Sequence, residues 1–422
     1  MRTVWQTKKL AEVCQIKPPK KEAKELLEES DLVSFVPMND LGVRQKWLNN
    51  KETKALREVV GSYTYFGDND VLLAKITPCF ENGKLGIAQG LKNGIGFGSS
   101  EYIVFRSKGE IDPEYLFYFL SQDSFRDAGA KVMTGAVGHK RVPKEFIENH
   151  KIPLPEPEEQ KRIVAILDEA FAGIDTAIAN TEKNLTNARE LFESIQERLL
   201  TNDESYEVIC LGEVTKVLTD YHANGAYSKL KEKVELKDAE DFAWMVRSTD
   251  FENNFKNDMR YISKDAYGFL EKSKVFGGEI IMSKIGNAGK VYLMPEISRP
   301  CSLAMNLFLI RLNETKISNE FAFRYMKSKN GEAQILSKLK GTATLTITKD
   351  SVRSIEIPLW PREKQDHVVS KLYEIEKAIR ELENVLLQKL SSFYELKQSL
   401  LQKAFSGELT AKADKSMDKA VA

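Results

Sequence analysis

The stretch Ile152-Pro-Leu-Pro-Glu-Pro-Glu-Glu-Gln-Lys-Arg-Ile-Val164 returns 205 residues later as Ile357-Pro-Leu-Trp-Pro-Arg-Glu-Lys-Gln-Asp-His-Val-Val369. Each copy opens a segment with helical periodicity, and the same offset holds without a gap through both segments. Prolines precede each helical pattern and prevent an earlier start of the helix. A repeat of this length indicates that a whole structural unit is duplicated.

The apolar positions of both helical segments are three and four residues apart, which is the seam of a coiled coil. About 43 residues at 1.5 Å each predict rods of roughly 60 Å. From this seam we select as packing residues Ile163, Leu167, Ile174, Leu185, Ile195, Leu372, Ile379, Leu386, Phe393 and Leu400. The same seam includes Leu191, Leu382 and Leu396.

Three arrangements of these helices are open. The first is an antiparallel pair within one chain, with a globular domain at each end. The second is a parallel dimer between two chains, and the third is two unrelated surface helices. Small residues in the middle of the first seam, such as Ala177 and Ala188, leave room for large ones in the second, such as Phe393. This complementarity favours the pair within one chain.

The segments before each helix also resemble each other. Phe66-Gly-x-x-Asp70-Val-Leu-Leu-Ala-Lys75-Ile76 matches Phe276-Gly-Gly-Glu279-Ile-Ile-Met-Ser-Lys284-Ile285, and both patterns predict a turn followed by a buried strand. Between such anchors the two halves diverge, most clearly at residues 77–100 and 286–300. The sequence thus predicts one frame that carries two different surfaces, as a protein that reads two different half-sites would need.

The expected fold class is mixed α+β, with a pseudo-twofold internal repeat. Two globular α/β domains are separated by a long antiparallel two-helix coiled coil. The expected boundaries are a first domain at 1–151, a central helix at 152–205, a second domain at 206–356, a C-terminal helix at 357–410 and a disordered tail at 411–422.

Net charge, apolar runs and cysteine content limit the classes of protein to which this chain could belong. The 422 residues carry no net charge, which argues against a general binder of polyanions. The charge is about +2 over residues 1–150, −6 over 151–205 and +3 over 206–357, so any affinity for nucleic acid must come from local patches. No membrane-spanning apolar run or secretory segment is present, and four scattered cysteines suit a reducing compartment. We therefore expect a cytoplasmic protein.

The repeated Ile-Pro-Leu segment and the C-terminal Leu401-Gln-Lys-Ala-Phe-Ser-Gly-Glu-Leu-Thr410 resemble the specificity subunit of type I restriction–modification enzymes. The resemblance covers nearly the whole chain. It implies two target-recognition domains that each read one half of a split, asymmetric site in double-stranded DNA. It also implies that the helix pair sets the spacer and docks two modification subunits, which use S-adenosylmethionine to methylate adenine. Restriction subunits would complete the complex and use ATP and Mg²⁺, while this chain itself would be non-catalytic and bind no cofactor.

The residues show no motif that argues for an enzyme. There is no Asn-Pro-Pro-Tyr-like methyltransferase motif and no phosphate-binding P-loop. The four histidines lack the spacing of metal ligands, so no metal site is expected. A coiled-coil scaffold without sequence-specific DNA binding remains the main alternative, and a self-contained enzyme is a third.

Candidate DNA contacts are basic and small polar residues on loops beside glycines, because such side chains reach phosphates and base edges. Lys75 and Lys284 occupy matching strand ends and are expected to bind phosphate. The remaining candidates are Lys84, Lys92, His139, Lys140, Arg141 and Lys144 in the first half, and Arg247, Ser248, Lys290, Lys338, Lys340, Thr342 and Thr344 in the second.

Overall fold

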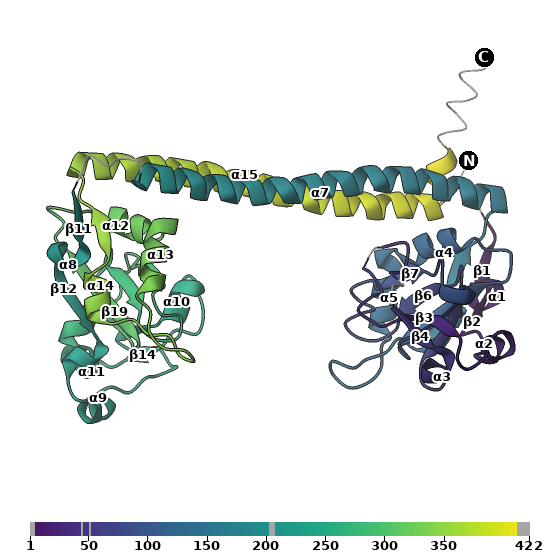
Figure 1. Ribbon diagram of the computed structural model, residues 1–422, viewed down its shortest axis with the longest axis horizontal. Coiled ribbons are helices and arrows are strands. Elements are labelled where there is room, and N and C mark those ends of the chain that lie inside the picture. The colour runs from purple at the N-terminus through teal and green to yellow at the C-terminus, as the bar shows by residue number, and fades with distance from the viewer. Residues whose placement is uncertain (1–4, 44, 50–51, 202–206, 412–422) are drawn as a thin grey trace, which may run out of the picture. The chain divides into compact units, whose positions relative to one another are not determined.

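The computed structural model describes residues 5–43, 45–49, 52–201 and 207–411 (Figure 1). It consists of two compact units, Met1–Glu182 with Leu387–Ala422, and Lys183–Leu386. The disordered tail expected at 411–422 lies outside the described residues, apart from residue 411.

The described part of the first unit contains two four-stranded sheets and a two-stranded ribbon. One sheet has the order β2-β9-β6-β7, made of Cys14–Ile16, Tyr102–Ser107, Val71–Ala74 and Leu85–Ile87. The other has the order β4-β3-β8-β5, made of Glu52–Ala55, Leu32–Val36, Ile95–Gly98 and Thr64–Gly67. The ribbon pairs β1 (Thr7–Lys9) with β10 (Lys151–Pro153). Strands β3 and β8 are parallel, and the other pairs are antiparallel.

The described part of the second unit repeats this topology. Its sheets have the orders β12-β19-β16-β17, made of Thr215–Asp220, Leu307–Leu312, Ile280–Ser283 and Val291–Leu293, and β14-β13-β18-β15, made of Tyr261–Ile262, Ala243–Val246, Cys301–Leu303 and Lys274–Val275. The ribbon pairs β11 (Val208–Cys210) with β20 (Glu356–Pro358), and β13 is parallel to β18. The equal strand orders confirm the predicted internal repeat.

Short helices surround these sheets. In the first unit they are α1 (Leu10–Val13), α2 (Lys21–Leu26), α3 (Leu56–Val59), the 3-10 turn η1 (Lys92–Gly94), α4 (Pro113–Leu120), α5 (Asp123–Lys131) and α6 (Lys144–Asn149). In the second they are α8 (Leu211–Val214), η2 (Tyr221–Asn224), α9 (Tyr227–Lys233), α10 (Ser248–Glu252), α11 (Lys264–Phe269), η3 (Glu271–Ser273), α12 (Asn319–Met326), α13 (Lys329–Ser337) and α14 (Lys349–Arg353).

Two long helices contribute to both units. They are α7 (Pro157–Thr201) and α15 (Arg362–Phe405). In the first unit Lys397 donates to Asp175, and in the second Arg189 donates to Glu383 at 2.7 Å. The two residue numbers of each pair add to the same total, so the helices run antiparallel within each unit and in one register. The antiparallel pair within one chain, expected from the sequence, is confirmed. No described helix contains a stretch long and apolar enough to cross a membrane.

The predicted seam is wrong at three positions. Leu191, Leu382 and Leu396 are 54%, 44% and 45% exposed. The next residue along, Phe192, Glu383 or Lys397, turns inward instead. At 3.6 residues per turn the inward face advances by four residues at these points, where the sequence offers a leucine after three. The long stem of Lys397 takes the place of the expected leucine, and its ammonium nitrogen lies 4.7 Å from the centre of the Phe171 ring.

Most of the selected seam residues face inward. Buried positions are Ile163, Leu167, Ile174, Leu372 and Leu386, and partly buried ones are Leu185, Ile195, Ile379, Phe393 and Leu400.

The ends of the long helices are part of each unit's hydrophobic core. In the first unit Ile163 and Leu167 of α7 share a core with Leu401 and Phe405 of α15, and α4 lies between them and the sheet (Figure 1). In the second unit Leu200 of α7 joins Val368 and Leu372 of α15 in the corresponding core. Burial of these apolar side chains fixes the helices to the domains.

A buried glutamine anchors the start of each long helix. In α7, Gln160 donates to the carbonyls of Glu110 and Pro155, both at 2.9 Å, and accepts from the Asp112 amide at 2.8 Å. In α15, Gln365 bonds in the same way to the carbonyls of Lys316 and Trp360 and to the Ser318 amide. Both side chains are fully buried, so every hydrogen bond they make replaces one that water would supply.

Candidate nucleic-acid interface

A hairpin loop lies beside the end of strand β6 in the first unit. Thr134 and Arg141 exchange backbone hydrogen bonds of 3.0 and 2.8 Å, and Arg141 also forms a bridge with Ile76. The Val142 amide then donates to the Lys75 carbonyl at 2.9 Å. The loop of residues 134–141 is thereby attached to the chain just after β6, beside the strand-end lysine.

The second unit has the corresponding loop, residues 340–346. Lys340 and Thr346 exchange bonds of 2.9 and 2.8 Å, Thr346 forms a bridge with Ile285, and the Ile347 amide donates to the Lys284 carbonyl at 3.1 Å. The two loops therefore occupy the same place in the repeated frame. Their tips differ: the first reads Gly-Ala-Val-Gly-His-Lys and the second Gly-Thr-Ala-Thr-Leu.

Each strand-end lysine is held by the protein's own oxygens. The Lys75 ammonium donates to the Ser100 carbonyl at 3.0 Å and lies 3.9 Å from the Glu101 carboxylate. Burial lowers the pKa of Lys75, and this effect exceeds the opposing pull of Glu101 because the ion pair is long. Arg141 instead binds Glu101 through two bonds of 2.9 and 2.8 Å, and these hydrogen bonds lower the pKa of Glu101.

In the second unit the strand-end lysine, Lys284, is held by the carboxylate of Asp220. Lys284 donates to Asp220 at 3.0 Å, and Lys349 lies 3.8 Å from the same carboxylate. Burial by itself would raise the pKa of Asp220, but the hydrogen bond from Lys284 and the two positive charges lower it. For either lysine to bind a DNA phosphate, its ammonium would have to share or exchange its present partner.

The other predicted contacts fall into two groups. The first group consists of exposed side chains at the two loops or on η1, namely Lys92, His139, Lys140, Lys340, Thr342 and Thr344. Several others are bonded to the protein itself: Lys84 to the Met38 carbonyl at 2.6 Å, Lys144 to Glu148 at 2.8 Å, Arg247 to Asp250 at 2.7 Å and Lys290 to Glu252 at 2.9 Å. Ser248 and Lys338 are partly buried.

The structure therefore brings only some of the candidate DNA contacts together, at the two loops and around α10. Lys75, His139, Lys140 and Arg141 meet at the first loop, and Lys284, Lys340, Thr342 and Thr344 meet at the second. Arg247, Ser248 and Lys290 lie around α10.

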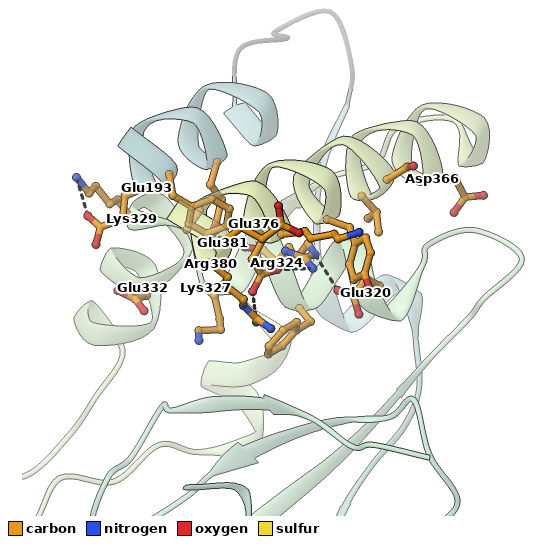
Figure 2. Close-up of a pocket in the computed structure, with 18 of the residues that line it drawn as sticks. Glu193, Glu320, Arg324, Lys327, Lys329, Glu332, Asp366, Glu376, Arg380 and Glu381 are labelled. Atoms are coloured by element: carbon orange, nitrogen blue, oxygen red, sulfur yellow. Dashed lines mark hydrogen bonds and ion pairs between the residues drawn. The ribbon is translucent and has the colours of Figure 1, made fainter. Parts of the chain in front are cut away.

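Sequence reasoning missed a groove in the second unit (Figure 2). It has a volume of about 1170 Å³ and lies between α12, α13 and the two long helices. Arg324 of α12 binds Glu320 at 2.7 Å and Glu376 of α15 at 3.1 Å, while Lys329 pairs with Glu193 of α7 at 3.4 Å. The only sequence signal was the four-residue spacing of Glu320 and Arg324, which is common on helix surfaces.

The first unit has a related groove of about 940 Å³. It lies between α5, α7 and α15 and is lined by Asp123, Asp127, Asp175 and Lys397, among others. Both grooves are thus formed where a domain meets both long helices. They are mixed in charge and open, as expected for surfaces that contact another macromolecule rather than a small ligand.

Comparisons with known proteins agree with this architecture. The family model described as "Type I restriction modification DNA specificity domain" matches residues 3–187 and 203–392. A relative, the type I restriction enzyme EcoEI specificity subunit of Escherichia coli, is 34% identical over 205 residues, which are 48% of this chain and 34% of that protein. The chain spans about a third of the length of that curated relative.

Two solved structures share the fold. One, reported on complex assembly and conformational transition of the type I R-M system, has a TM-score of 0.78 at 18% identity and covers 96% of this chain and 98% of that chain. The other, the HsdS subunit from Thermoanaerobacter tengcongensis, has a TM-score of 0.59 at 17% identity and covers 96% and 97%. Two matched domains, the repeated topology and these likenesses lead to one conclusion: the chain belongs to the type I restriction modification DNA specificity family.

Proposed function

We propose that this chain is the DNA-recognition subunit of a type I restriction–modification complex, and that each domain reads one half of a split, asymmetric target in double-stranded DNA. One observation carries the proposal. Two domains with the same strand order present loops of different sequence, 134–141 and 340–346, at the same place beside a strand-end lysine. A repeated frame with unlike tips suits a protein that must read two different sequences through the same geometry.

The two grooves support a second part of the proposal, which concerns partners. Each groove is formed by one domain together with both long helices, so each offers a composite surface for one modification subunit. Two such methyltransferase subunits would bind S-adenosylmethionine, and restriction subunits would add cleavage with ATP and Mg²⁺. The chain itself would be non-catalytic and would act in the cytoplasm.

The test is to express this chain with its cognate modification subunit in a host without other adenine methylation and to sequence the methylated positions. We expect one motif made of two short, unlike halves separated by a fixed unspecified spacer. A continuous methylated motif would count against a spacer function of the helices.

The scaffold alternative makes a different prediction. The assembled complex would then show no sequence-dependent retention of DNA. A self-contained enzyme would instead methylate or cleave DNA when the purified chain is incubated alone with S-adenosylmethionine and Mg²⁺.

A further inference from the structure

The tip of the first loop carries an apolar side chain that nothing covers within the described residues. Val137 is 93% exposed, the largest value among the exposed large hydrophobic residues of the described chain. Its neighbours Ala136 and Gly138 are exposed as well. Leaving a valine in water forgoes the free energy that its burial would supply, about 1.5 kcal/mol or more. Such a residue at a functional loop tip points to a surface that it meets on binding.

The tip is nevertheless well defined. The His139 amide donates to the Ala136 carbonyl at 2.9 Å, which closes a four-residue turn with Val137 in the second position. Gly138 follows with a φ of +81°, the value that the third position of a type II turn requires. At Gly135 a Cβ atom would lie 2.9 Å from the His139 carbonyl oxygen, so glycine is needed there too. The backbone therefore holds Val137 in one outward position.

Arg141 acts as the support of this turn. Its guanidinium donates twice to Glu101 and once, at 3.3 Å, to the His139 carbonyl. Its backbone bonds to Thr134. These bonds pair the guanidinium with the domain's own Glu101 carboxylate, so we assign Arg141 a positioning role. The contact with a bound partner is then made by Val137 at the tip.

The surroundings of Val137 suit nucleic acid. His139 and Lys140 are exposed on the same loop, and Lys75 and Arg141 lie at its base. An apolar tip with Lys140 beside it and two cations at its base matches a groove that is lined by phosphates and has apolar groups at its floor. In the major groove the apolar group available is the 5-methyl of thymine. The corresponding loop of the second unit presents Thr342 and Thr344, which carry hydroxyl groups at the tip.

We propose that Val137 contacts the 5-methyl group of a thymine in the half-site read by the first domain, and so helps to determine that half-site. This inference rests on the proposed function, because it requires that the first domain read DNA. The tip of the second loop carries Thr342, Thr344 and the partly exposed Leu345 instead, so the two domains would meet their half-sites through different side chains.

The experiment uses the chain assembled with its modification subunits and a duplex that carries the methylated motif. Each thymine of the first half-site is replaced in turn by deoxyuridine, which removes only the methyl group, and the dissociation constant is measured by fluorescence anisotropy. For one thymine we expect about a four-fold weaker binding, the effect of one lost buried methyl group. In V137A the same replacement should have no effect, since the methyl has lost its contact.

Two further variants serve as controls. V137T keeps the shape of the side chain but replaces one methyl by a hydroxyl, and should lose part of the sensitivity to deoxyuridine. T344A, on the second loop, should leave that sensitivity intact. Because Val137 is exposed, these changes should not alter the melting temperature of the chain.

The outcomes separate the two proposals. A first half-site without thymine, or an equal deoxyuridine effect in wild type and V137A, overturns the assignment of Val137 while the split motif still supports the proposed function. If V137A weakens assembly with the modification subunits and leaves DNA discrimination unchanged, the tip is a protein contact and the assignment is also wrong. A complex that methylates no split sequence overturns the proposed function itself.

Discussion

Gln160 and Gln365 show how single residues join the long helices to the domains. Each makes two donor bonds and one acceptor bond to backbone groups in the buried junction. The glutamine at this repeat position was visible in the sequence, yet polarity favours the surface for such a residue. Its burial follows only from the backbone groups that the fold brings around it.

Replacing Gln160 by leucine keeps the volume but leaves those backbone groups without partners. We expect Q160L to lower the stability of the first unit by about 3 kcal/mol. Scanning calorimetry should show the loss as a lower melting temperature. Gln402 is exposed on α15, and Q402L should change the melting temperature little. Equal effects of the two substitutions would contradict the anchoring role.

His150 makes the stability of the first unit depend on pH. Its ring packs against Phe119, Phe125 and Phe146, with centroids 5.7, 4.9 and 5.2 Å apart. Burial lowers the pKa of His150 below its ordinary value of 6.5. The unfolded chain therefore takes up this proton first, and the folded state loses stability as the pH falls below 6.5.

Phenylalanine at this position would complete the aromatic cluster without a titrating group. We expect H150F to show a smaller fall in melting temperature than wild type between about pH 7.5 and pH 5.5. H139Q, which changes the exposed histidine of the loop, should retain the wild-type fall. An unchanged pH dependence in H150F would show that another group is responsible.

At the scale of elements, apolar periodicity predicted both long helices, and the complementary small and large residues of the two seams favoured their antiparallel pairing. It misplaced the seam at Leu191, Leu382 and Leu396, because a leucine one position early matches the average spacing equally well. The tertiary structure chose Glu383 and Lys397 instead, where paired charges and long stems fill the interface. A hydrophobic pattern therefore does not predict that a charged residue, rather than the neighbouring leucine, occupies these positions of the interface.

The two leucines Leu382 and Leu386 of α15 test the corrected seam. L386A removes a side chain that is 8% exposed and should cost about 2–4 kcal/mol, whereas L382A acts at a side chain that is 44% exposed and should cost less than about 1 kcal/mol. Thermal denaturation of the two variants gives the comparison. Similar losses in both would restore the seam that the sequence first predicted.

At the scale of the whole molecule, the register of the helix pair gives a deletion that tests the spacer function. Residues 180–186 of α7 correspond to residues 386–392 of α15 in the register that the Asp175–Lys397 and Arg189–Glu383 pairs share. Deleting both segments removes one heptad from each helix, keeps the remaining partners aligned and shortens the pair by about 10 Å. Sequencing of methylated sites should then reveal the same half-sites with a shorter spacer.

A control deletes four residues from each helix, which breaks the heptad and should lower the melting temperature. Should the seven-residue deletion fold normally and retain the original spacer, the helices do not set that length.

The sequence by itself determined the duplication, the order of globular and helical parts, the buried strands after Asp70 and Glu279, and the family resemblance. These features depend on local patterns and on an offset of 205 residues that can be read along the chain. Only the tertiary structure decided which of the candidate basic side chains already bind oxygen atoms of the protein itself. It paired Lys75 with Ser100, Lys284 with Asp220 and Arg141 with Glu101, and it left Val137 at a loop tip. The physical reason is that hydrogen bonds and burial depend on groups distant in sequence, which become neighbours only when the sheets are formed.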